Sequence, residues 1–153
     1  MLRLALAWLH LLALGLGLGA VIFRGSALRE EATAAGLRRA FRADTLWGIA
    51  AGLWITTGLW RAIGHTEKSL SYYLANDVFW AKMGMLVLIL LLEIWPMMTL
   101  IRWRKSLARG AEPTQFAHAG SRRRIALISH IEATLVVLMV LAAVSMARGY
   151  GAR

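Results

Sequence analysis

Two charged residues of opposite sign, Lys82 and Glu93, lie within one long apolar stretch, residues 76–104. They are eleven residues apart. On an α-helix this spacing is a net rotation of about 20°, so both side chains point from the same face. An ionisable group at bilayer depth costs on the order of 3 kcal/mol and normally faces the inside of a helix bundle, where it finds a partner. The pair therefore predicts a buried polar face that other polar groups must meet.

The elements that carry these residues are four long apolar runs. The chain has 153 residues, of which 59% are hydrophobic and 17% charged, with a mean hydropathy of +0.58. A soluble domain of this length would be less apolar. We therefore expect one domain, residues 1–153: an all-α, integral membrane four-helix up-down bundle with helices at about 4–23, 45–61, 78–101 and 125–147. The first run has spanning length, which favours a transmembrane helix over a cleaved signal peptide.

The positive charge is concentrated between these runs. The net charge is +10, and residues 24–43 and 102–124 hold 12 of the 18 lysines and arginines. The positive-inside rule then predicts that loops one and three are cytoplasmic and that both termini are periplasmic, in a multi-pass protein of the bacterial inner membrane. The same loops are expected to attract anionic lipids. No motif that reads DNA or RNA accompanies the charge, so nucleic acid is not an expected partner.

The second apolar run is the shortest of the four. Asp44 precedes it directly and is predicted to be the N-cap of its helix. The preceding segment, residues 26–41, is expected to form either a short helix on the membrane surface or a solvated loop. Gly48 and Gly52 have the GxxxG spacing that is typical of a packing groove for a neighbouring helix.

The rise per residue places the polar groups of the four helices in two layers. The outer layer is predicted to contain His10 and Lys82. The inner layer is predicted to contain five residues: Glu93, His130 and Glu132, edged by Arg24 and Asp44. The partner of Glu93 stays open between His130 and Arg24, and a purely structural ion pair there is as compatible with the sequence as a functional one.

The absence of cysteine excludes disulfides, thiolate metal sites, iron–sulfur clusters and covalently attached haem, and no other metal-binding motif is predicted. His10 and His130 should lie about 13 Å apart along the membrane normal, which is too far for one haem to take both as axial ligands. A haem b on His10, with Lys82 opposite, remains open, as does the absence of any cofactor. For His10 itself, a packing residue, a haem or metal ligand and a proton carrier are all retained.

Three segments carry a family resemblance: residues 42–61 (RADTLWGIAAGLWITTGLWR), residues 72–83 (YYLANDVFWAKM), and the stretch from Trp95-Pro96 to RWRK at 102–105. Together they resemble the bacterial family of uncharacterised predicted membrane proteins called domain of unknown function 2214. More distantly, the chain resembles the four-helix HemJ-like and CopD-like membrane proteins. That distant resemblance implies that His10 and Lys82 bind haem.

Two main hypotheses about function follow, and whether the protein is an enzyme stays open. The first is a haem-associated or redox-linked membrane protein that uses His10 and Lys82 near the outer face. The alternative is a non-enzymatic accessory or assembly subunit that packs against a larger membrane complex or against further copies of itself. A third hypothesis is passage of protons or small ions through Lys82, Glu93 and His130. The apolar residues between the two layers argue against this passage.

Overall fold

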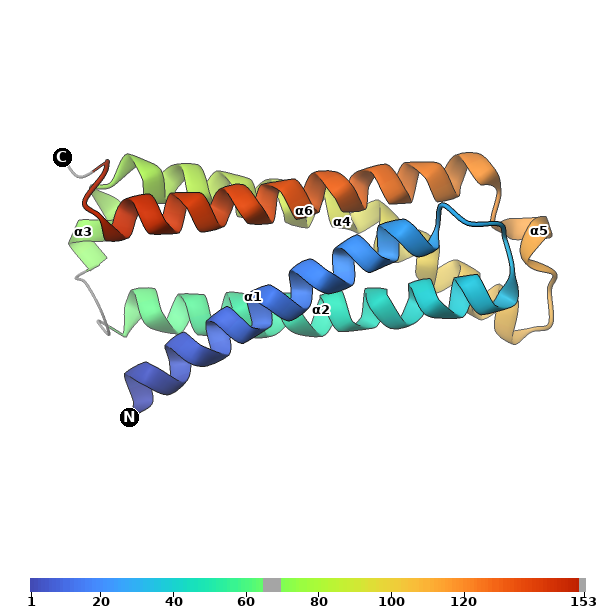
Figure 1. Cartoon of the computed structure of the whole chain (residues 1–153), viewed down its shortest axis with the longest axis horizontal. Helices are drawn as coiled ribbons and strands as arrows, with labels where there is room; N and C mark the ends of the chain where they lie inside the picture. Colours follow the sequence, from blue (N-terminus) through green and yellow to red (C-terminus); the bar gives the residue numbers. More distant parts are fainter. Residues whose placement is uncertain (65–69, 152–153) are drawn as a thin grey trace.

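The computed structural model describes residues 1–64 and 70–151, and the elements in these ranges are helices. In chain order they are α1 (Leu2–Ala27), α2 (Ala34–Ile63), α3 (Leu70–Leu74), α4 (Asp77–Ala108), α5 (Pro113–Phe116) and α6 (Ala119–Ala147). The four long helices lie side by side, with both chain ends at one end of the molecule and α5 at the other (Figure 1). Within the described part, α1, α4 and α6 are long and apolar enough to cross a membrane.

Helix α1 is the centre of the packing. Both α2 and α6 pack on it, α4 packs on α6, and α2 and α4 touch each other much less. The close approach of α1 and α2 depends on Gly17, because a Cβ atom there would lie 3.3 Å from the Cβ of Ala50 and from the ring of Trp47. The order of packing is therefore α2–α1–α6–α4, which makes the α2–α4 side the most open one.

Helix α2 corrects the predicted start of the second run. It begins at Ala34, with Thr33 as its N-cap, and the Thr33 hydroxyl accepts a 3.0 Å hydrogen bond from the Gly36 amide. The prediction that Asp44 is the N-cap is wrong, because Asp44 lies inside the helix. Residues 26–41 do not form one segment: residues 26–27 end α1, residues 28–33 connect the two helices, and residues 34–41 are the first turns of α2, where Leu37 and Phe41 are buried. The first turns of α2 are polar, so the apolar run from which the helix was predicted does not include them.

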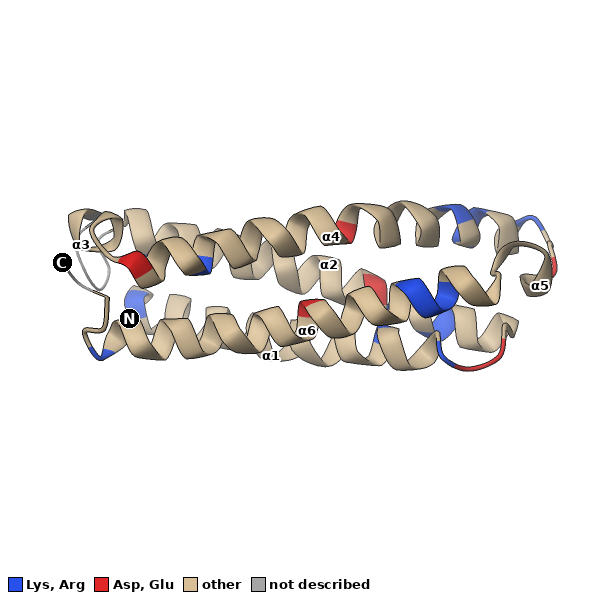
Figure 2. Ribbon diagram, turned by 90° about the horizontal axis from the view of Figure 1, so that it is seen from above, with Lys and Arg blue, Asp and Glu red and all other residues tan. Residues whose placement is uncertain are grey.

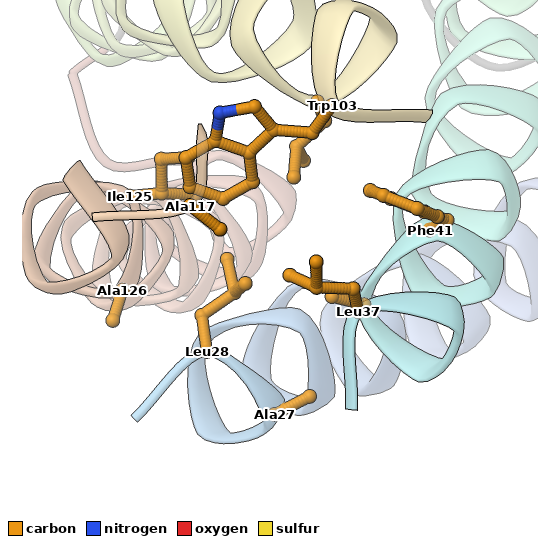
Figure 3. Close-up of a cluster of buried hydrophobic side chains, with 10 residues drawn as sticks. Ala27, Leu28, Leu37, Phe41, Trp103, Ala117, Ile125 and Ala126 are labelled. Atoms are coloured by element: carbon orange, nitrogen blue, oxygen red, sulfur yellow. The ribbon is translucent and has the colours of Figure 1, made fainter. Parts of the chain in front are cut away.

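Two apolar clusters fill the interior at different levels. The first lies at the α5 end, where Leu28, Leu37 and Phe41 meet Trp103 and Ile125 (Figure 3). The second lies nearer the chain ends and includes Val21, Trp47, Trp54, Ile89 and Met139. Polar side chains occupy the level between them.

The predicted GxxxG groove is not used within the chain. Gly48 and Gly52 are exposed, and a Cβ atom added to either would meet no atom within 4 Å. Gly25 allows a close approach of α1 and α6, because a Cβ there would lie 2.7 Å from Cε1 of His130. The glycines that allow close helix contacts on α1 are therefore Gly17 and Gly25, whereas Gly48 and Gly52 of α2 face outward.

Candidate functional site

Arg24 is the centre of the polar level between the two apolar clusters. It lies in the last turn of α1, and its side chain is fully buried. A guanidinium has five N–H donors, and each one of Arg24 donates a hydrogen bond. Nε donates to the Ser129 hydroxyl at 3.0 Å, and the other four donors reach carboxylate oxygens. One buried arginine thus joins side chains from α1, α2, α4 and α6, which we call the Arg24 cluster: Arg24, Asp44, Glu93, Ser129 and Glu132.

The three carboxylates bind Arg24 in different ways. Glu93 accepts two parallel bonds, from Nη1 to Oε1 at 2.7 Å and from Nη2 to Oε2 at 2.9 Å. Asp44 accepts one bond from Nη1 to Oδ1 at 2.9 Å. Glu132 accepts one bond from Nη2 to Oε2 at 2.7 Å. Two-bond arginine–carboxylate pairs are the strongest and most directional of such contacts, so Glu93 is the principal counter-ion of Arg24.

Charge is not balanced within the cluster. One guanidinium faces three carboxyl groups. A second cation, Arg104, approaches from α4, with its Nη2 4.0 Å from Oδ2 of Asp44. With Arg24 assigned to Glu93 and Arg104 to Asp44, the carboxyl group of Glu132 is the one in excess. Its Oε1 is buried and has no hydrogen-bond partner among the described residues.

Exposure differs sharply within the cluster. The side chains of Arg24 and Glu132 are 0% exposed, whereas those of Asp44 and Glu93 are 12% and 19% exposed. Apolar clusters lie on the two axial sides of this level. The partly exposed carboxylates belong to α2 and α4, which pack on each other much less than α2 packs on α1 or α4 packs on α6. The cluster therefore opens sideways, between α2 and α4.

His130 lies next to the cluster but contacts other groups. Its Nδ1 donates a 2.6 Å hydrogen bond to the carbonyl of Ala126, one turn earlier on α6, and its ring packs against Gly25. Of the two partners considered for Glu93, the structure places Arg24 against it. Ser129, which the sequence reasoning did not single out, occupies the place at Nε of Arg24. The sequence feature that could have indicated Ser129 is its three-residue spacing from Glu132, which puts both residues on one helix face.

The two residues of the expected outer layer lie on α1 and α4. His10 is half-buried, and its Nδ1 is 2.9 Å from Oγ1 of Thr57 on α2. The Thr57 hydroxyl donates to backbone carbonyls one turn earlier, so it accepts from His10 Nδ1–H. The ring stacks on Trp54 with a centroid distance of 5.7 Å. Lys82 is half-buried on the second turn of α4.

The carboxylates and histidines of the described residues do not form a metal site. Among residues 1–64 and 70–151, no group of three or more His, Asp or Glu side chains is arranged to hold a metal ion. The three carboxylates of the cluster converge instead on a guanidinium. The arrangement is that of a protonatable ion network buried in an apolar protein.

Comparison with known proteins gives one family match. A family model described as "Predicted membrane protein (DUF2214)" matches residues 2–151, nearly the whole chain. No curated protein and no solved structure gives a match. The comparisons add no support to the more distant resemblance to HemJ-like and CopD-like proteins.

Proposed function

Because the chain belongs to the DUF2214 family of predicted membrane proteins, we propose that it is a four-span inner-membrane protein whose Arg24 cluster binds and exchanges a proton. The observation that carries the proposal is Glu132, a fully buried carboxyl group with one unpartnered oxygen beside an arginine that already has a two-bond counter-ion.

The exposed face of α2 supports a fourth span. The helix has 30 residues, about 45 Å at 1.5 Å per residue, which is enough to cross a core of ~30 Å. Its tryptophans, threonines and glycines lower its hydropathy, yet large apolar side chains line its outer face: Leu46, Ile49, Leu53, Leu59 and Trp60. Such a face is stable against lipid rather than against water. Four spans put both chain ends on one side.

The distribution of basic residues indicates how the molecule is oriented in the membrane. Basic residues gather toward the α5 end, and acidic residues occur in the middle of the long helices (Figure 2). By the positive-inside rule the α5 end is cytoplasmic and the chain ends are periplasmic. Lys68 and Arg153, which the charge count included, lie outside the described residues. Glu93 is 15 residues before the end of α4, so the cluster lies well inside the helical body, about 22 Å from that end.

A proton on Glu132 would resolve the excess charge. An isolated ionised carboxylate in an apolar interior is very costly, and such a group usually takes up a proton instead. Arg24 cannot compensate all three carboxylates at once, and Arg104 reaches only Asp44. A neutral Glu132 still accepts the hydrogen bond from Arg24 through one oxygen and carries its proton on the other. Ionisable residues inside membrane helices are by default candidates for proton relays.

The partly exposed carboxylates supply a route for exchange. Nη2 of Arg24 bonds both Oε2 of Glu132 and Oε2 of the partly exposed Glu93, which brings the two carboxyl groups together. The guanidinium itself keeps its protons, so the route runs from Glu132 to Glu93, directly or through water. The apolar cluster around Trp47, Trp54 and Ile89 closes the path toward the chain ends. The apolar cluster around Phe41, Trp103 and Ile125 closes the path toward the α5 end as well. The proton therefore exchanges sideways, between α2 and α4, in this conformation. The proposed exchange does not require an open pore between the polar level of the Arg24 cluster and the level of His10 and Lys82.

Infrared spectroscopy of the purified protein tests the proton directly. We expect a carboxylic-acid carbonyl band at neutral pH that shifts in D₂O, disappears in Glu132→Gln, and persists in Glu112→Gln, which alters an exposed residue before α5. A neutral-pH spectrum without this band, or a band that survives in Glu132→Gln, would refute the proposal. A band that does not shift after long incubation in D₂O would refute exchange.

The haem role of His10 and Lys82 has one contact in its favour and one against it. A ligating histidine is usually oriented through its other ring nitrogen, as Thr57 orients His10. However, the ring also lies on Trp54, and a Cβ at Gly58 would be only 3.1 Å from its Cε1, so the side chain is part of the α1–α2 packing. A Soret band in purified protein that is lost in His10→Ala would support the haem role, and its absence would exclude it.

The accessory-subunit alternative is favoured by a different surface. Gly48 and Gly52 form an exposed GxxxG face on α2, and this face suits close packing of a helix from another molecule. We expect Gly52→Leu to release a co-purifying protein or a second copy if this face is an interface. An unchanged association state in mild detergent would count against it.

A further inference from the structure

We propose that the groove between α2 and α4 binds one anionic phospholipid, with its phosphate held by arginines at the cytoplasmic interface. The groove has a volume of about 460 Å³ and lies on the side where the two helices pack least closely. It is distinct from the Arg24 cluster, although Arg104 borders both. The inference does not depend on proton binding by Glu132.

The lining of the groove changes from basic to apolar along α2. Arg38 and Arg42 lie one turn apart at its cytoplasmic end, and Leu46 and Ile49 follow on the same helix face. From Arg38 to Ile49 the helix rises about 16 Å, which takes the groove from headgroup level into the acyl-chain region. A phospholipid has the same order of chemistry along its length: a negative phosphate followed by apolar chains.

Arg104 completes the basic end from the opposite helix. Its Nη2 donates to the Phe41 carbonyl at 2.9 Å and to Oγ1 of Thr45 at 3.1 Å. Its guanidinium also lies over the Phe41 ring, 5.3 Å from the centroid. These contacts fix the direction of the guanidinium, while about half of the side chain remains exposed to the groove. An arginine held in this way is a preorganised partner for a phosphate.

Charge complementarity decides the occupant. Three arginines line the groove, and the residues that line it include no carboxylate. Arg42 and Arg38 are exposed, so their charges are available to a ligand. A protein helix would have to bring acidic residues to one end and an apolar face to the other. An anionic lipid of the inner leaflet already has a negative headgroup at one end and apolar chains at the other, and it is always present at this depth. Each basic residue near the surface attracts such a lipid by about 1 kcal/mol.

Native mass spectrometry of the full-length protein in nanodiscs tests the site. Discs of phosphatidylcholine containing a small share of phosphatidylglycerol should leave one phosphatidylglycerol bound after mild activation. Arg42→Gln and Arg38→Gln should each weaken this retention about fivefold, since each removes one interfacial charge. Arg39→Gln is the matched control, because Arg39 is exposed, pairs with Glu30 and does not line the groove.

Three results would overturn the proposal. The first is equal retention in Arg42→Gln, Arg38→Gln and wild type. The second is an equal loss in Arg39→Gln, which would indicate attraction by the general surface charge. The third is equal retention of phosphatidylcholine, which would show that the groove does not select negative charge.

Discussion

Arg24 on α1 and Glu93 on α4 face each other through two parallel hydrogen bonds of 2.7 and 2.9 Å, although α1 and α4 each pack mainly on other helices. The guanidinium extends from the end of α1 across the centre of the molecule, so it also reaches Asp44 and Glu132. A single side chain thus fixes the lateral positions of all four long helices. Variants of Arg24 test the role of the cluster in stability, and variants of Glu132 test its role in proton binding.

Replacement of Arg24 should be the most damaging single change in the polar level. Arg24→Gln leaves three carboxyl groups without their shared cation, and breaking a buried pair in this way typically costs about 3–5 kcal/mol. Arg24→Lys should not restore stability, because an ammonium has three donors in place of five and cannot form the two-bond contact with Glu93. Thermal unfolding in mild detergent measures both effects.

The matched control is Arg39→Gln, which removes an exposed pair with Glu30. Exposed pairs contribute from nothing to about 1 kcal/mol, so its melting temperature should stay close to that of the wild type. A wild-type melting temperature in Arg24→Gln would show that the cluster does not hold the helices together.

The two glutamates of the cluster should respond differently to neutralisation. Glu93→Gln converts a charged two-bond partner into a neutral one, so it should lower the stability by about 2 kcal/mol or more. Glu132→Gln replaces a carboxyl group that we expect to be neutral already, so it should change the stability by less than about 1 kcal/mol. Unfolding of the two variants at neutral pH gives the comparison. Equal destabilisation would mean that Glu132 is ionised in the folded protein.

Gly25 should tolerate no side chain while His130 is present. The added methyl of Gly25→Ala would lie 2.7 Å from Cε1 and 2.9 Å from Nδ1 of His130, so the His130 ring or one of the two helices must shift. Overpacking of this kind usually costs about 1–3 kcal/mol. The double variant Gly25→Ala/His130→Ala should recover part of the loss, because it removes the ring that clashes.

Gly52→Ala provides the comparison for this prediction. Its new Cβ would meet nothing within 4 Å, and alanine is the better helix former by up to about 1 kcal/mol. Gly52→Ala should therefore leave the melting temperature unchanged or slightly higher. A fully additive double variant at Gly25 and His130 would show that these two residues do not contact each other.

The sequence predicts the depth of polar groups better than their partners. Position along a helix follows from the chain itself, which is why Arg24, Asp44 and Glu93 could be assigned to one level from spacing alone. The partner of Glu93 depends on which helices are neighbours and how each is rotated, and that information is not in the periodicity of one helix. The choice between Arg24 and His130 therefore needed the structure.

The start of α2 shows a second limit of prediction from the sequence. An apolar run begins directly after Asp44, so the aspartate had the expected place of an N-cap. The helix is capped earlier by Thr33, and its first turns alternate exposed arginines with buried apolar residues such as Leu37. This amphipathic segment continues into the apolar run without a break. Hydropathy marks where a helix enters lipid, which is not where the helix begins.

The number of membrane crossings can be measured by labelling, since the chain contains no cysteine of its own. Single cysteines at Ala35, Ile63, Ala111 and Tyr150 report on the three connections between the spans and on the tail. With four spans and a periplasmic start, Ile63→Cys and Tyr150→Cys should react with a membrane-impermeant maleimide in intact cells. Ala35→Cys and Ala111→Cys should react only after the cells are opened. If α2 did not cross, all sites after it would change sides: Ala111→Cys would react, whereas Ile63→Cys and Tyr150→Cys would be protected.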